Sequence, residues 1–250
     1  MIADLEGMPV RDCVLVVLTR VIGGSSLLLF FVFFGFYRGP ALADLHLSGP
    51  AALLWDGALS LAFFLQHSLM VRRGVRTRLS RLVASHALGA LYSVASGAVL
   101  AAVILLWQRA GPRLAAVTGP ARWTGTALSA LALLASAWAA LSLRGFDPFG
   151  ARAIEAHLRG AVPRPPPFHV RGPYRWVRHP QYLCFLLVIW SSPELTADRL
   201  LFDLLWTAWI LLGTALEERD LQAQLGEPYR AYRSRVPMLL PWRRPAEPTG

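Results

Sequence analysis

The sequence predicts an all-α, polytopic integral membrane protein, and three observations lead to this prediction. Of the 250 residues, 55% are hydrophobic and only 16% are charged, whereas roughly a quarter of residues are charged in a soluble globular protein. The apolar residues form long blocks, close to the roughly 20 residues that a helix needs to cross a bilayer. Arginine-rich stretches separate these blocks, which is typical of membrane-spanning chains.

We expect about six membrane spans, the last two forming a tight helical hairpin around residues 191–194. The first span resembles a retained signal anchor, because the acidic residues Asp4 and Glu6 precede it and a cleaved signal peptide has a basic flank. The second hairpin arm is predicted to run on past Glu217. The six apolar stretches are 13–37, 51–70, 83–107, 123–143, 181–193 and 200–216.

The basic residues predict how the chain sits in the membrane. The net charge is +10, and all 25 basic residues are arginines. Five lie in 71–82, seven in 144–180 and six from residue 219 onward, against five in the three connecting segments on the other side. The positive-inside rule then places both termini and the 144–180 connection in the cytoplasm, as in a bacterial inner-membrane protein. Because this charge lies beside apolar spans, it indicates contact with membrane lipid and excludes nucleic acid as the expected partner.

Metal and disulfide chemistry are not expected. The two cysteines, Cys13 and Cys184, both lie in apolar stretches, and no spacing typical of metal-binding Cys and His residues occurs. Both thiols are therefore interpreted as buried and inert.

The first candidate site is the segment 172–182, which reads GPYRWVRHPQY. Gly172-Pro173 predicts a turn, and Pro180 suits the first turn of the helix that follows. Aromatic, cationic and imidazole groups are thus placed at a helix N-terminus, where free backbone N–H groups favour anions. The alternative is an interfacial aromatic belt with arginines that only set topology.

Two further features lie downstream. Glu217 and Glu218 are adjacent at the end of an apolar helix, so they point about 100° apart and do not form a shared acid pair. One carboxylate can face the interior, either as a ligand anchor or as a simple partner of a nearby arginine. Tyr229 and Tyr232 share one helix face at a spacing of three, which an amphipathic interfacial helix would also show.

In combination, these motifs resemble the isoprenylcysteine carboxyl methyltransferase superfamily. The order is GPYRWVRHPQY, an apolar hairpin, EERDL, then GEPYRAY and VPMLLP at 236–241. The region 146–241 is most similar to the bacterial branch of methanethiol S-methyltransferases and NnrU-like proteins. The segment FDPFGARAIEAHLRG at 146–160 and the run Gln66-His67-Ser68 before a basic loop also fit that branch.

The resemblance implies a membrane methyltransferase that binds S-adenosylmethionine at the cytoplasmic face. It implies three parts: membrane helices in 1–143, a cofactor-binding core in 144–241 whose connection, hairpin and C-terminal helix form the pocket, and a polar tail in 242–250. Arg178 is a candidate for the cofactor carboxylate on physical grounds, and His179 and Glu217 are the candidates for proton transfer. The residues that the resemblance places on the cofactor are Phe168, His169, Tyr174, His179, Pro180, Gln181, Tyr182, Glu217, Tyr229 and Tyr232.

Three departures from the family pattern bear on the acceptor. Cys184 stands where the family usually has glycine, and Asp198-Arg199 replaces the usual Gly-His. Gly213 stands where carboxyl methyltransferases are expected to hold the acceptor carboxylate with an arginine. The expected acceptor is therefore small and membrane-partitioning, a thiol rather than a prenylated carboxylate, and no obligate protein partner is evident. The alternatives are a non-enzymatic NnrU-like accessory protein, an isoprenylcysteine or lipid methyltransferase, or a nicotinamide-dependent reductase.

Two ionisable residues of the second apolar stretch lie outside these motifs. Asp56 and His67 are about three helical turns apart and cannot act as one pair. For His67 the simpler interpretation is packing or a hydrogen bond to a neighbouring helix, although ionisable groups inside a membrane are functional candidates.

Overall fold

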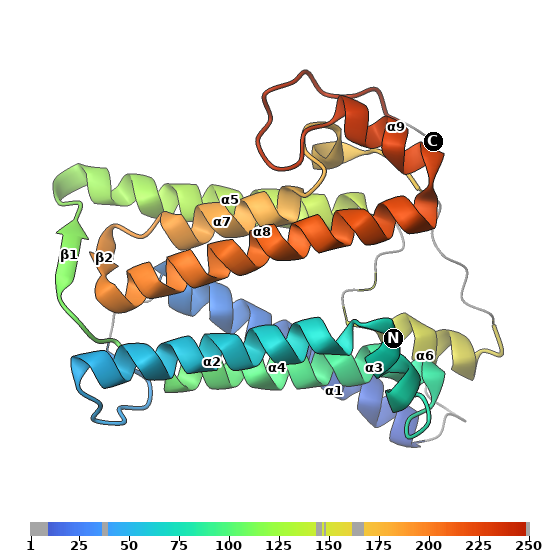
Figure 1. Ribbon diagram of the computed structural model, residues 1–250, viewed down its shortest axis with the longest axis horizontal. Coiled ribbons are helices and arrows are strands. Elements are labelled where there is room, and N and C mark those ends of the chain that lie inside the picture. The colour runs from blue at the N-terminus through green and yellow to red at the C-terminus, as the bar shows by residue number, and fades with distance from the viewer. Residues whose placement is uncertain (1–9, 37–39, 144–146, 148, 162–167, 249–250) are drawn as a thin grey trace.

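The fold is a bundle of long helices (Figure 1). The computed structural model describes residues 10–36, 40–143, 147, 149–161 and 168–248. The acidic N-terminal flank on which the signal-anchor prediction rests lies outside the described residues, as do parts of 146–160 and residues 165–167.

Five long helices and the shorter α7 form two layers that lie on one another in the described part of the chain (Figure 1). The first layer contains α1, α2 and α4, and the second contains α5, α7 and α8. Contacts between α2 and α8 join the layers. The bounds are Val10–Phe31 for α1, extended by a π-helical turn Val32–Phe36, Gly49–Met70 for α2, Leu88–Leu106 for α4, Arg122–Ser142 for α5, Pro180–Trp190 for α7 and Ala197–Leu225 for α8.

Short elements gather at the two ends of the bundle. The helices α3 (Arg73–Leu79), α6 (Ala151–Leu158) and α9 (Glu227–Arg235) lie at one end, and the strands β1 (Arg113–Ala116) and β2 (Glu194–Thr196) lie at the other (Figure 1). Three 3₁₀ turns complete the described elements, at Ser85–Ala87, Gly119–Ala121 and Gly172–Arg175. The candidate site lies at the α9 end.

The helical prediction is confirmed, and the chain is an integral membrane protein. Among the described residues, four helices are long and apolar enough to cross a membrane: Asp12–Phe36, Ser85–Leu106, Gly119–Ser142 and Ala197–Leu225. The other two predicted spans also form helices. Of these, α2 carries Asp56, Gln66 and His67, and α7 is only 11 residues long.

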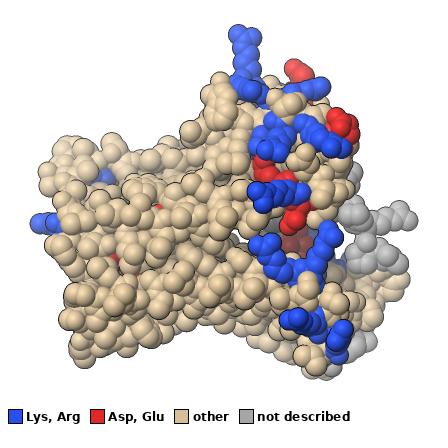
Figure 2. Space-filling model, viewed as in Figure 1, with Lys and Arg blue, Asp and Glu red and all other residues tan. Residues whose placement is uncertain are grey.

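The outer surface of the bundle differs from that of a soluble protein in the number of large apolar side chains that it exposes. Large apolar side chains such as Leu54, Leu134, Leu141 and Leu212 are exposed along the helices, which indicates a face made for lipid. Figure 2 shows arginine and acidic side chains crowded at the end that carries α3, α6 and α9, with few at the strand end. This division matches the charge pattern of the sequence.

One part of the fold was not predicted. β1 and β2 form an antiparallel pair, with Arg113 opposite Thr196 and Ala116 opposite Glu194, so the chain is not purely helical. The prediction treated 108–122 and 191–199 as simple connections on the same side of the membrane. Each strand is only three or four residues long, too short for an alternating pattern to be visible.

Aromatic side chains fill the space between the layers. Phe34 of the π-helical turn stacks on Phe202 of α8 with ring centroids 3.7 Å apart, and Trp206 packs against Phe30, Phe63 and Phe202. All of these rings are buried. Their packing fixes α8, and with it the residues that α8 carries to the candidate site.

The crossing of α1 and α4 depends on glycine. A Cβ atom at Gly97 would lie 3.0 Å from Ile22 and Ser26 of α1. We expect Gly97→Val to destabilise the protein by about 1–3 kcal/mol through overpacking, measured as a lower melting temperature in detergent. The matched control is Gly57→Val in α2, where a Cβ atom would meet nothing within 4 Å. Equal melting temperatures for the two variants would contradict the prediction.

Candidate functional site

A cavity of about 420 Å³ opens at the α9 end, between the ends of α5 and α8, the start of α7 and α9. Its volume lies in the range of roughly 300–1,000 Å³ that is usual for small-molecule sites. The structure brings all eleven cofactor-contact residues predicted from the sequence to its wall. The lining residues are Ser142, Leu143, Phe168, His169, Arg171, Tyr174, Arg178, His179, Pro180, Gln181, Tyr182, Glu217, Leu221, Leu225, Tyr229 and Tyr232.

The start of α7 forms as the sequence predicts. Gly172 has a positive φ of 52°, and a Cβ atom there would collide with Ser142, so the turn requires glycine. The 3₁₀ turn Gly172–Arg175 follows, and α7 begins at Pro180. This geometry places Tyr174 and Gln181 on the cavity wall.

The segment that follows α9 packs against the residues before α7 and closes one side of the cavity. The backbone N–H groups of Arg178 and His179 donate to the carbonyls of Pro237 and Met238, at 2.9 and 3.1 Å. The Tyr232 hydroxyl donates to the carbonyl of Tyr174 at 2.7 Å. Two motifs nearly 60 residues apart in the sequence are therefore joined through their backbones.

Glu218 is the buried hub of this end of the molecule, with only 6% of its side chain exposed. Arg178 binds both of its oxygens, at 2.5 and 2.8 Å, in a bidentate ion pair. His179 Nε2 lies 3.1 Å from the same carboxylate, the Tyr229 hydroxyl donates to it at 3.3 Å, and Arg233 approaches it at 3.3 Å. Glu218 thus ties α7, α8 and α9 together.

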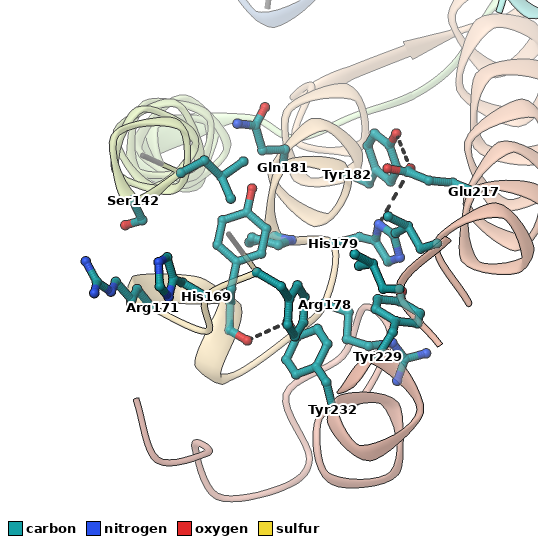
Figure 3. A pocket seen from close by; sticks show the side chains of 16 residues that line it. Ser142, His169, Arg171, Arg178, His179, Gln181, Tyr182, Glu217, Tyr229 and Tyr232 are labelled. Atoms are coloured by element: carbon teal, nitrogen blue, oxygen red, sulfur yellow. Dashed lines mark hydrogen bonds and ion pairs between the residues drawn. The ribbon is translucent and has the colours of Figure 1, made fainter. Parts of the chain in front are cut away.

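Glu217 points the other way, into the cavity (Figure 3). Its side chain is 43% exposed, and it accepts a hydrogen bond of 2.7 Å from the Tyr182 hydroxyl. His179 Nδ1 lies 3.8 Å from it. The two adjacent carboxylates therefore divide as the helix geometry predicts, and the one on the cavity is available to a ligand.

His179 is held on both sides. Its two ring nitrogens face Glu217 and Glu218, and its ring is stacked parallel to that of Tyr182 with centroids 5.4 Å apart. A histidine between two carboxylates is well placed to orient them. Its Nε2 is thus taken up by Glu218, and its Nδ1 faces the Glu217 carboxylate.

Aromatic rings form another part of the cavity wall. Phe168, Tyr229 and Tyr232 meet edge to face, with centroids 5.4 to 6.2 Å apart. Burial, together with the nearby Glu218 carboxylate, raises the pKa of Tyr229 to about 12, and burial also raises the pKa of Tyr174 and Tyr232. These phenols stay neutral at physiological pH, as donors and as stacking surfaces.

One predicted contact has a different partner in the structure. Arg178 lines the cavity, but its guanidinium binds Glu218 and the carbonyls of Arg233 and Val236. Arg171, which the sequence analysis did not name, lies with His169 across the cavity from Glu217 (Figure 3). Leu221 and Leu225 were also missed, although they follow Glu217 at spacings of four and eight and so share its helix face. No sequence signal points to Ser142.

The departures from the family pattern lie outside the cavity wall. Cys184 is buried against Ala132 of α5 and Val188. Asp198 and Arg199 lie in the first turn of α8, at the strand end of the bundle. Asp198 accepts from the Trp107 indole at 3.2 Å, and Arg199 pairs with Asp203 at 3.0 Å. These three residues pack the helices together, and they do not line the cavity.

Comparison with known proteins gives consistent matches. A family model described as NnrU protein matches residues 57–236. A methanethiol S-methyltransferase of Mycobacterium tuberculosis is 35% identical over 240 residues, covering 90% of this chain and 96% of that protein. A methanethiol S-methyltransferase of Pseudomonas sp. (strain GM41(2012)) is 36% identical over 78% of this chain and 75% of its own length. Nurim from Rattus norvegicus is 30% identical over 69% of each chain. No solved structure matches.

These matches confirm the resemblance that the motifs predict. The matched residues 57–236 run from α2 through α9 and include every residue that lines the cavity. Because the family model matches residues 57–236 and the relatives match most of its length, this chain is a member of the NnrU family.

Proposed function

We propose that this protein is a membrane methyltransferase that transfers the methyl group of S-adenosylmethionine to a small thiol. The observation that carries the proposal is the convergence on one cavity of all eleven residues that the sequence predicts as cofactor contacts. The relatives named methanethiol S-methyltransferase support a thiol acceptor, and methanethiol is the first one to test.

The residues of the cavity fit S-adenosylmethionine. This cofactor combines an aromatic base, a ribose diol, an ammonium, a carboxylate and a sulfonium, and it supplies a methyl group bound to a positively charged sulfur. Glu217 offers a carboxylate oxygen, Oε1, that has no partner among the described residues and can accept from the diol or the ammonium. Phe168, Tyr229 and Tyr232 offer faces for the base and for cation–π contact. Arg171 and His169 are the groups placed to receive the carboxylate.

The chain itself contributes position and exclusion of water. Glu218 binds Arg178 and His179 behind the wall, and Tyr182 donates to Glu217 on the cavity side, so the ligand-facing carboxylate is held in position. The tail pairing at 237–238 closes the cavity from below. Fixing both reactants in one orientation can supply much of the rate enhancement in a direct transfer.

The topology that accompanies this function has six spans, with α2 and α7 added to the four long apolar helices. Both termini and the donor site lie in the cytoplasm of a bacterial inner membrane, a placement supported by the arginines gathered at the α9 end. Residues 144–241 carry the donor site, 1–143 supply most of the membrane helices, and 242–250 form the tail. α5 packs on α7 and Ala246 bonds to Arg175, so these parts work as one body.

The test uses the full-length protein purified in detergent. We expect saturable binding of isotope-labelled S-adenosylmethionine, and formation of dimethyl sulfide when methanethiol is added, measured by gas chromatography of the headspace. Binding with no product from methanethiol or other small thiols would overturn the thiol acceptor. No binding by folded protein would overturn the methyltransferase.

A further inference from the structure

A polar group near the end of α2 has no role in the donor site described above. The Tyr92 hydroxyl of α4 lies 2.7 Å from Nε2 of His67 and 3.1 Å from its Nδ1. Beside this pair, the Gln66 amide donates to the Ser96 hydroxyl at 3.2 Å. Polar groups at this depth in a membrane helix bundle are rare and usually have a function.

The His67–Tyr92 pair lies against the helices that carry the donor site. The His67 ring meets the edge of Trp209 in α8 at 5.2 Å between centroids, and the Trp209 indole donates to Ser68 at 3.3 Å. Trp209 lies two turns before Glu217 on α8, and Glu217 accepts from the Tyr182 hydroxyl of the cavity wall. The pair therefore packs against the helix that carries the ligand-facing carboxylate.

α8 leaves a gap between these two groups. Trp209, Gly213 and Glu217 follow one another at a spacing of four and so form one row along the helix. A Cβ atom at Gly213 would meet nothing within 4 Å. Among the described residues, no atom apart from the local helix therefore lies within 4 Å of the Gly213 Cβ position, on the row between Trp209, which contacts His67, and Glu217, which faces the cavity. Figure 2 shows the surface hollowed between the two layers at this end of the molecule.

We propose that the space beside Gly213 receives the acceptor thiol and that the Tyr92–His67 pair takes its proton. The proposal rests on the proposed function, because it names the acceptor side of the same site. Gly213 supplies no cation to hold a carboxylate, and the Trp209 indole lies one helical turn away, which suits a small uncharged thiol. His179 is less suited to the proton transfer because both of its nitrogens face carboxylates.

Each bond that forms in the proton transfer and the methyl transfer is matched by a bond that breaks. The thiol S–H bond breaks and its electron pair stays on sulfur, since the thiolate is the nucleophile. The proton passes to Tyr92 Oη while the Tyr92 proton passes to Nε2 of His67, which becomes an imidazolium. The sulfur pair forms the new bond to the methyl group, and the pair of the broken carbon–sulfur bond stays with the donor. One positive charge thereby moves from the sulfonium to His67.

Two variants test the relay, Tyr92→Phe and His67→Gln. General acid–base catalysis contributes roughly 10²–10⁴-fold, so we expect kcat with methanethiol to fall at least about 100-fold at pH 7, with unchanged donor affinity. The defect should shrink at alkaline pH, where solvent supplies the thiolate. Among the described residues, the titratable group in contact with His67 is Tyr92 of α4, and the other rings against it are Phe63 and Trp209. The matched control is His86→Gln, a half-buried histidine that stacks on His157.

Two further measurements do not depend on the behaviour of those variants. Gly213→Leu should fill the space without a clash, so we expect at least a tenfold loss in kcat/KM for the thiol with unchanged donor affinity. In ¹⁵N-histidine NMR of the detergent-solubilised protein, methanethiol alone should shift one imidazole signal, the one missing in His67→Gln.

The outcomes distinguish a failure of the proton relay or of the acceptor position from a failure of the proposed function. If the wild type binds donor and methylates thiols, but Tyr92→Phe or His67→Gln keeps kcat within threefold at pH 7, the relay is wrong and the proposed function stands. If Gly213→Leu leaves kcat/KM unchanged, the acceptor does not bind there. If the folded wild type binds no donor, the proposed function fails and this inference fails with it.

Discussion

We expect Glu217→Gln to lower the affinity for S-adenosylmethionine at least about tenfold while the protein stays folded. Glu217 is the half-exposed carboxylate of the cavity wall, and its one hydrogen bond to a side chain among the described residues comes from Tyr182. A hydrogen bond to a charged group contributes about 1.5–3 kcal/mol, and each 1.4 kcal/mol is a factor of ten in affinity. Loss of the charge removes this contribution and leaves α8 unchanged.

Equilibrium dialysis with labelled donor, beside a melting curve in detergent, measures both parts of this prediction. The matched control is Glu227→Gln, an exposed glutamate of α9 that pairs with Arg230 on the surface. The control should bind donor as the wild type does. A Glu217→Gln protein with donor affinity within twofold of the wild type would remove Glu217 from the site.

Glu218→Ala should have the opposite character, a loss of stability first and of binding only as a consequence. The Glu218 carboxylate is buried and holds Arg178, His179, Tyr229 and Arg233. Removing one partner of a buried ion pair leaves the other charge uncompensated and costs about 3–5 kcal/mol. We therefore expect a much lower melting temperature and early proteolytic cleavage around α9.

Comparing the Glu217 and Glu218 variants distinguishes a ligand-binding carboxylate from a structural one. Glu218→Ala should melt early both with and without donor, whereas Glu217→Gln should melt like the wild type without donor and lack the stabilisation that donor gives the wild type. If the two variants behaved alike, the division between one structural and one ligand-facing carboxylate would be wrong.

Much of this structure follows from local sequence. Hydropathy places the six helices of the two layers, because a helix in lipid satisfies its own backbone and leaves a largely apolar run in the sequence. The order of the motifs predicts the cavity residues, and the helix repeat predicts that Glu217 and Glu218 diverge.

What the sequence could not give are the contacts between distant segments. β1 and β2 are separated by nearly 80 residues and are too short to show a strand pattern. The sequence is equally compatible with Arg178 as a ligand-binding group and as the partner of Glu218. The folded structure shows that Arg178 binds Glu218. The contact between His67 and Tyr92, and the empty space at Gly213, likewise depend on how α2, α4 and α8 lie against one another.

The backbone pairing of Arg178 and His179 with Pro237 and Met238 has a consequence for biosynthesis. The ribosome delivers residues 236–246 only after α1 to α8 have been made and can already enter the membrane. Until residues 236–246 emerge and pair, the part of the cavity wall that they hold in place is incomplete. We therefore expect a nascent chain to gain the ability to bind donor only after residue 246 has been made.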